Sequence, residues 1–142
     1  MKKLPFYFFL FVCLNIFAHP NTLTEKYSYE MAYLPTPLPD RVVLTWNDNP
    51  ATTQAVNWRT DVSVQEGIAQ LAIANSNGRA LEPKEFKAET TYFKSDINQA
   101  HYHSVTFKNL KSDTLYAYRV GDGVNWTEYY HFKTASSEEK PF

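Results

Sequence analysis

Three histidines come nearest to a metal site in their spacing. His101 and His103 are two residues apart and therefore share one face of an extended strand, and His131 follows on a later segment. A zinc-type site needs further ligands, and no cysteine or carboxylate stands at ligand spacing from this pair. We therefore predict exposed or half-buried histidines of a sheet, and no metal-binding residue in the sequence.

Paired carboxylates and nucleophile motifs are also missing. Asp48 and Asp61 fall in loops at opposite ends of one expected strand, too far apart to act as a general acid and base. No G-x-S-x-G, H-E-x-x-H or glycine-rich phosphate loop occurs, and the sequence has only 4 glycines. The single cysteine, Cys13, lies in an N-terminal leader. We predict no catalytic residue.

Two features could support binding or modification. Trp46, Trp58 and Trp126 are candidates for a sugar-stacking platform, although the alternation around Trp58 predicts a core position and only Trp126, beside a turn, is a candidate for exposure. Asn125 opens the tripeptide Asn-Trp-Thr, which fits the acceptor pattern for N-glycosylation. Asn125 is therefore a candidate glycosylation site.

The elements that must position these residues are strands, and residues 110–116 give the clearest pattern. Alternating segments flank this heptapeptide, which begins at Leu110, includes Thr114 and ends at Tyr116. In many antiparallel sandwiches such a tyrosine fills the core while its hydroxyl satisfies a backbone group a few residues upstream. We predict a structural corner formed by Leu110, Thr114 and Tyr116.

Strands are expected wherever apolar and polar residues alternate between turn residues. The expected strands are 41–46, 53–60, 68–74, a weaker edge strand at 85–93, 101–110, 115–120 and 126–134. The side chains expected to face inward are Val56, Trp58, Val105, Phe107, Leu110, Tyr116, Tyr118, Val120, Tyr130 and Phe132, with Asn57 and Arg59 facing outward. About seven short strands with regular turns predict an all-β, antiparallel sandwich of the fibronectin type III or immunoglobulin-like class.

The ends of the 142-residue chain differ from its middle. Residues 1–18 have two lysines, a short apolar run and a small residue, the pattern of a signal peptide, which predicts a secreted or otherwise extracytoplasmic protein. Residues 19–38 are expected to form a linker or N-terminal arm that ends in three prolines, and residues 39–135 the sandwich domain. Residues 136–142 are expected to be a further linker.

The charge balance narrows the class of partner. Without Lys2 and Lys3 of the leader, 12 lysines and arginines face 15 acidic residues, a net charge of −3. A mildly acidic domain without a basic cluster lacks the charge pattern of a nucleic-acid-binding protein. We expect neither nucleic acid nor, once the leader is cleaved, a membrane as a partner.

Several ordered motifs together resemble one known family. They are Pro39-x-x-Val42, Val56-x-Trp58-x-Thr60, His103-x-Val105-x-Phe107-x-x-Leu110, Thr114-x-Tyr116-x-Tyr118-Arg119-Val120-Gly121 and Phe132-Lys133-Thr134. This set is similar to the N-terminal, fibronectin-III-like domain of purple acid phosphatases. Ser112 stands where the corner often has proline.

The resemblance implies a two-domain, metal-dependent acid phosphatase in which a metallophosphoesterase domain follows the sandwich. That domain would hold two metal ions, iron with iron, zinc or manganese, which clamp the phosphoryl group and supply a metal-bound hydroxide. None of the family's metal-ligand motifs occurs in this sequence, and the Gly121-Asp122 pair belongs to an expected hairpin. We therefore expect no cofactor in this chain, which is either a fragment or the product of a truncated gene.

Two functions follow as hypotheses. The first is a non-catalytic N-terminal domain of a secreted purple acid phosphatase that supports its catalytic domain or a homodimer. The alternative is a free-standing adhesion or carbohydrate-binding module of the fibronectin type, resting on Trp126, Tyr129 and the turn that holds Asn125.

Overall fold

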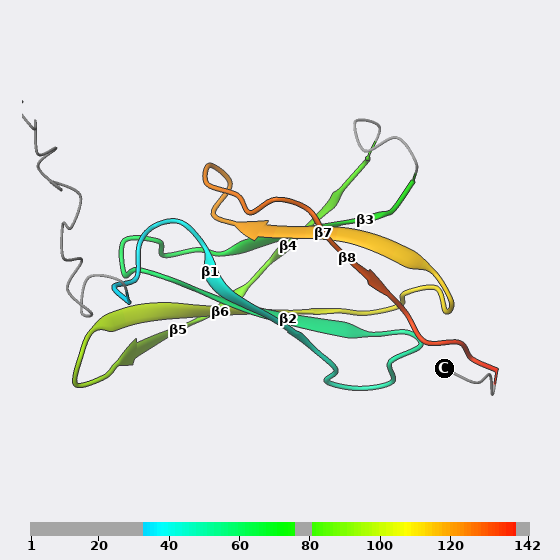
Figure 1. Ribbon diagram of the computed structural model, residues 1–142, viewed down its shortest axis with the longest axis horizontal. Coiled ribbons are helices and arrows are strands. Elements are labelled where there is room, and N and C mark those ends of the chain that lie inside the picture. The colour runs from blue at the N-terminus through cyan, green and yellow to red at the C-terminus, as the bar shows by residue number, and fades with distance from the viewer. Residues whose placement is uncertain (1–32, 76–80, 139–142) are drawn as a thin grey trace, which may run out of the picture.

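The computed structural model describes residues 33–75 and 81–138, which form eight strands in two four-stranded sheets (Figure 1). Every strand pairing within the two sheets is antiparallel. The described part contains no helix, and hence none long and apolar enough to cross a membrane. The fold is the predicted all-β sandwich, with eight strands where about seven were expected. The predicted signal peptide and most of the predicted arm lie outside the described residues.

The first sheet has the strand order β1-β2-β6-β5. These strands are β1 (Asp40–Thr45), β2 (Gln54–Thr60), β6 (Gln99–Phe107) and β5 (Glu89–Lys94). Trp58 of β2 lies opposite His103 of β6, and His103 lies opposite Thr90 of β5. Directly opposed residues point to the same face, so these three side chains share the inner face of the sheet.

The second sheet has the strand order β4-β3-β7-β8. Its strands are β4 (Lys84–Lys87), β3 (Ile68–Ile73), β7 (Leu115–Gly121) and β8 (Tyr130–Lys133). The predicted strand at 68–74 is confirmed by β3, and the last two strands pair as predicted. The strand order places the edge strands β1 and β8 on one side of the sandwich and β5 and β4 on the other.

One predicted edge strand, 85–93, is two strands in the structure. The chain leaves the second sheet after Lys87 and enters the first sheet at Glu89, while the N–H of Ala88 donates to the carbonyl of Gly67 (2.8 Å). Phe86 packs on Phe107 of the core, and the inward alternation continues through the crossing. The alternation of inward and outward residues is not interrupted where the chain changes sheet, so the sequence predicted a single strand.

The last predicted strand, 126–134, is shorter than expected. β8 begins only at Tyr130, because residues 126–129 turn out over the second sheet, where Trp126 packs on Gly121. Tyr130, predicted to face inward, is 36% exposed beside this detour, whereas Phe132 is buried as predicted.

The core lies between the sheets and contains the other side chains predicted to face inward. Trp58, Phe107, Val56 and Val120 are fully buried. Phe132 stacks on Tyr116, with ring centroids 5.4 Å apart.

Strand β2 is buried on both faces. Arg59 points outward, as predicted, but only 3% of it is exposed. Its guanidinium donates to both carboxylate oxygens of Asp40 and to the carbonyl of Tyr33. The hydrogen bonds to Asp40 raise the pKa of Arg59 and keep its charge paired.

Candidate functional site

The three histidines do not form a metal site. His101 and His103 are buried rather than exposed or half-buried, which corrects the prediction, because they point into the sandwich at the β5 side. His131 is exposed and lies on β8, in the other sheet. Within residues 33–75 and 81–138, no group of three or more His, Cys, Asp or Glu side chains could hold a metal ion.

His103 occupies a defined place in the core. Its ring stacks on Trp58 (centroids 5.3 Å apart), its Nε2 is 2.8 Å from Thr60 Oγ1, and its Nδ1 is 2.9 Å from Thr90 Oγ1. The Thr60 hydroxyl donates to the carbonyl of Asp61, so it accepts from Nε2–H, and the Thr90 hydroxyl donates to Nδ1. In the neutral ring these contacts place the proton on Nε2.

Burial is the main reason why the pKa of His103 falls from 6.5 to about 4, and the neighbouring His101 contributes to the shift. The ring of His101 lies 6.2 Å from that of His103, and its Nδ1 donates to the carbonyl of Val64 (2.7 Å). Both histidines thus link neighbouring segments of the fold through hydrogen bonds.

The predicted corner is present at the opposite end of the sandwich. The backbone N–H of Lys111 donates to the hydroxyl of Tyr116 (2.8 Å), and the Tyr116 ring is buried. The hydroxyl of Thr114 donates to the carbonyl of Ser112 (2.8 Å). Leu110 is buried in the core cluster. All three corner residues therefore have structural contacts.

The carboxylates singled out from the sequence shape turns. Asp48 Oδ1 accepts from the N–H of Asn49 before β2, and Asp61 Oδ1 accepts from the N–H of Ser63 after β2. They lie at opposite ends of that strand, as predicted, and cannot act together on one substrate.

The aromatic residues behind the carbohydrate-binding alternative are engaged within the molecule. The guanidinium of Arg119 lies over the rings of Trp126 (4.4 Å from the centroid) and Tyr129 (4.9 Å). Gln70 accepts from Arg119 and from the Tyr129 hydroxyl and donates to Glu85. The guanidinium occupies the aromatic faces on which a sugar would stack, so this cluster covers the outer face of the second sheet.

Asn125 lies in the loop between β7 and β8 and is partly exposed. Its side-chain amide and its backbone N–H both donate to the carboxylate of Asp122. These hydrogen bonds help to lower the pKa of Asp122. Glycosylation of Asn125 stays a prediction.

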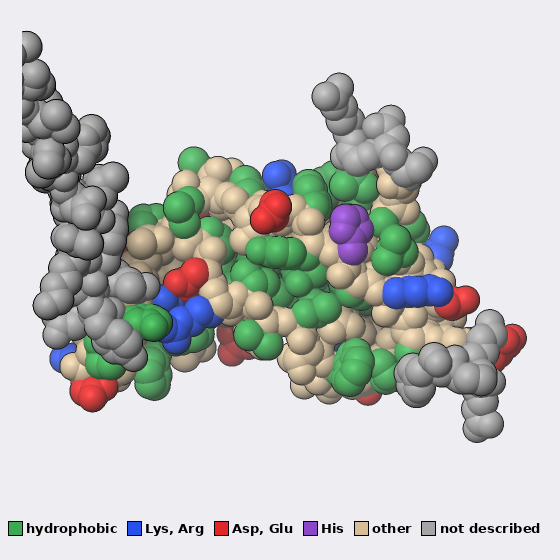
Figure 2. All heavy atoms as spheres, in the orientation of Figure 1, with side chains coloured by type: hydrophobic (Ala, Val, Ile, Leu, Met, Phe, Trp, Pro, Cys, Tyr) green, Lys and Arg blue, Asp and Glu red, His purple; other side chains and the backbone are tan. Residues whose placement is uncertain are grey.

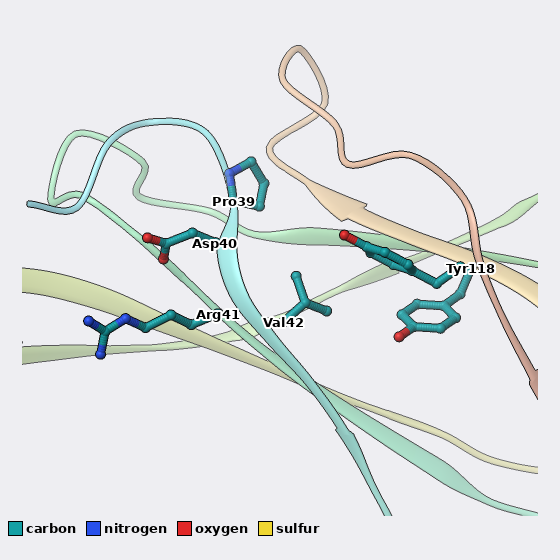
Figure 3. A pocket seen from close by; sticks show the side chains of 6 residues that line it. Pro39, Asp40, Arg41, Val42 and Tyr118 are labelled. Atoms are coloured by element: carbon teal, nitrogen blue, oxygen red, sulfur yellow. The ribbon is translucent and has the colours of Figure 1, made fainter. Parts of the chain in front are cut away.

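The open side of the sandwich, between the edge strands β1 and β8, is a feature that the sequence did not reveal. One hollow of about 220 Å³ is lined by Pro39, Asp40, Arg41, Val42, Tyr118 and Tyr130, and in Figure 3 Val42 points toward Tyr118 while Asp40 and Arg41 point away. A second, of about 310 Å³, is lined by Leu44, Thr45, Trp46, Gln54, Phe132 and Lys133. Figure 2 shows hydrophobic side chains gathered in the middle of this face.

Two backbone irregularities create the opening. The register of β1 on β2 shifts between Asp40 and Val43, with Arg41 at a φ of 49°, and β8 starts late. No motif spans the two edges, because their residues lie some 90 positions apart in the sequence. Alternation could locate each strand but not the gap between them.

Comparison with solved structures gives similar folds at low identity. The solution structure of a fibronectin type III domain of human contactin 1 is 15% identical with a TM-score of 0.48, covering 76% of this chain and 85% of that one. A computationally redesigned β-sandwich protein is 21% identical with a TM-score of 0.45, covering 70% and 96%. A search of curated proteins gives no match.

A family model described as the purple acid phosphatase N-terminal domain matches residues 39–134, which is more than half of the chain. The match includes the corner, the buried histidines and both edge strands of the open side. The chain therefore belongs to the purple acid phosphatase N-terminal domain family.

Proposed function

We propose that this chain is a non-catalytic supporting domain of a secreted purple acid phosphatase, and that it packs through its open side against the metallophosphoesterase domain. The observation that carries the proposal is the apolar face between β1 and β8. There Trp46 is 69% exposed and Tyr130 36% exposed, beside the two hollows. Contiguous exposed apolar surface marks an interaction site more often than a solvated face.

Two other surfaces offer less to a partner domain. The outer face of the second sheet carries the hydrogen-bonded cluster around Gln70 and Arg119, whose polar groups are already paired. The opposite side of the sandwich is crossed by the chain itself at Ala88. Within the described residues, the open side combines free strand edges with hollows that are lined in part by aromatic and aliphatic side chains.

The two metal ions of the family do not fit the described residues of this chain. The histidines of the first sheet are hydrogen-bonded inside the core, and His131 belongs to no group of three or more possible ligands within the described part. The chemistry of phosphomonoester hydrolysis would therefore belong to the partner domain, and this domain would support that partner or a dimer.

Two measurements test the proposal. The purified chain should hydrolyse no p-nitrophenyl phosphate in the presence of iron, zinc or manganese. A metal-dependent rate that is lost in the His101→Ala and His103→Ala variants would refute the non-catalytic role.

The docking surface is tested by titrating the chain with a purple acid phosphatase metallophosphoesterase domain in trans. Trp46→Asp should weaken binding at least 10-fold, since it places a charge in a desolvated contact worth about 1.4 kcal/mol or more. Ile97→Asp is the matched control, because Ile97 is 65% exposed in the β5–β6 turn on the other side. Equal binding by both variants, or self-association through the same face instead, would overturn the assignment of this partner.

A further inference from the structure

His103 joins three elements at the β5 side of the sandwich. Its ring contacts Trp58 and Thr60 of β2 and Thr90 of β5. It also packs on Gly67 of the segment between β2 and β3, where an added Cβ would lie 2.6 Å from Nδ1. His101 donates a hydrogen bond from Nδ1 to the carbonyl of Val64 in the same segment.

A second proton on this ring would place a positive charge in the core. Nδ1 accepts from the Thr90 hydroxyl, so a proton there would force that hydroxyl to turn and accept instead, and a hydroxyl does not neutralise the charge. The ring is fully buried, and a buried imidazolium needs a charged partner or water.

The groups facing the two histidines supply no such partner. From β2 come an indole and a hydroxyl, from β5 the hydroxyl of Thr90 and the ring of Tyr92 on His101, and from the segment 61–67 the backbone at Val64 and Gly67. The carboxylate of Asp61 is held by Ser63. Among the described residues, the other titratable side chains in contact with this pair are His101 itself, whose charge would repel one on His103, and Tyr92, whose ring meets His101 edge-on.

β5 lies at an edge of the first sheet, where a strand is held on one side only. β5 pairs with one neighbour, β6, and most of its side chains are exposed. The indole N–H of Trp58 is buried without a hydrogen-bond partner within the described part, so water entering here would satisfy it. An edge strand with few buried contacts is a natural unit of local unfolding.

We propose that His103 is an acid-sensitive latch, whose protonation releases β5 and the segment 61–67 from the sandwich while the corner end stays folded. The latch is closed when the ring is neutral and bridges Thr60 and Thr90. It opens when water must reach the charged ring.

The size of the effect follows from the protonation equilibrium. A ring that titrates near 4 when closed and near 6.5 when hydrated makes opening about 100-fold more favourable at pH 4 than at pH 7. The direction is fixed by the lowered pKa, because the open form binds the proton more tightly than the closed form.

Hydrogen exchange of the whole chain, corrected for the intrinsic pH dependence of exchange, tests the latch. Protection of amides in Glu89–Lys94 should fall about 100-fold between pH 7 and pH 4, and at both pH values it should lie below that of Leu115–Gly121, which exchanges only on global unfolding. His103→Gln should abolish the selective loss, since it keeps a neutral polar side chain. His131→Gln, which removes an exposed histidine, should leave the loss unchanged.

Three results would each overturn the proposal. Equal protection of β5 at pH 7 and pH 4 would show that the latch does not open. Equal protection factors in β5 and β7 at both pH values would show that both strands exchange by global unfolding. An unchanged β5 response in a folded His103→Gln variant would assign it to another group. The first two need only the wild-type chain, so the test survives a variant that fails to fold.

Discussion

Replacing Tyr116 with phenylalanine removes one oxygen atom and leaves the aromatic ring in place. The ring is buried and stacks on Phe132, so Tyr116→Phe keeps the apolar packing of the corner. The lost atom accepts the N–H of Lys111, five residues upstream. The variant therefore isolates a single hydrogen bond.

The expected loss of stability follows from that bond. A net hydrogen bond contributes about 1 kcal/mol, and a donor left without its partner in a partly buried place adds to this, so we expect a loss of about 1.5 kcal/mol. For a domain of roughly 100 residues this corresponds to a fall in Tm of about 8 °C. Urea unfolding followed by circular dichroism measures it, and an unchanged m-value would show that the unfolded state is unaltered.

Tyr118→Phe is the matched control. Tyr118 is as buried as Tyr116, but its side chain lines the hollow on the open side, and its hydroxyl makes no side-chain hydrogen bond within residues 33–75 and 81–138. Its removal should change the free energy of unfolding by less than about 0.5 kcal/mol. Equal losses in the two variants would refute the reasoning, because the corner bond would then contribute nothing specific.

Three further predictions concern charge, backbone and pH. Because the pKa of His103 is lowered to about 4, its neutral form stabilises the fold fully above pH 6.5, and the free energy of unfolding should fall by about 3 kcal/mol by pH 4. Urea titrations across this range measure the loss, and a flat profile would contradict the prediction. Asp40→Asn leaves the buried guanidinium of Arg59 without its counter-charge and should lower the free energy of unfolding by about 2 kcal/mol. The loss is smaller than for a fully buried pair because the Asp40 side chain is 40% exposed. A loss that disappears in 1 M salt would indicate a surface pair instead. Gly121→Ala should lower the free energy of unfolding by about 2 kcal/mol or more, because its Cβ would lie 2.1 Å from the carbonyl oxygen of Asn125. A Tm within about 2 °C of wild type would show that the loop can move aside.

Local patterns predicted the strands well where each strand buries one face against the core. The alternation through Val105 and Phe107 and the heptapeptide that ends at Tyr116 sufficed for β6, β7 and the corner, because side-chain period and turn chemistry are both local. The crossing of the chain from one sheet to the other at Ala88 was not predicted, since it does not interrupt the alternation.

The burial of His101 and His103 could not be foreseen for a related reason. Their i, i+2 spacing fixes a shared face but not which face, and nothing nearby in the sequence announces that threonines from two other strands meet them. Predicting the open side needs even more distant information, because β1 and β8 are the first and last strands of the domain. Sites formed between strands far apart in sequence become visible only once the sheet order is known.

The two ends of the sandwich differ in how firmly they are held, and this bears on how a supporting domain would act. At the corner, the Thr134 hydroxyl donates to the carbonyl of Lys111 (2.6 Å) and accepts from the N–H of Thr114 (3.0 Å). One residue on, Ala135 accepts from Asp113 and donates to Pro50 through its backbone. The C-terminal end of β8, which borders the open side, is therefore hydrogen-bonded to the corner that Tyr116 stabilises. A partner bound between β1 and β8 would contact this hydrogen-bonded end, and an acid-driven opening at β5 would leave its binding surface unchanged.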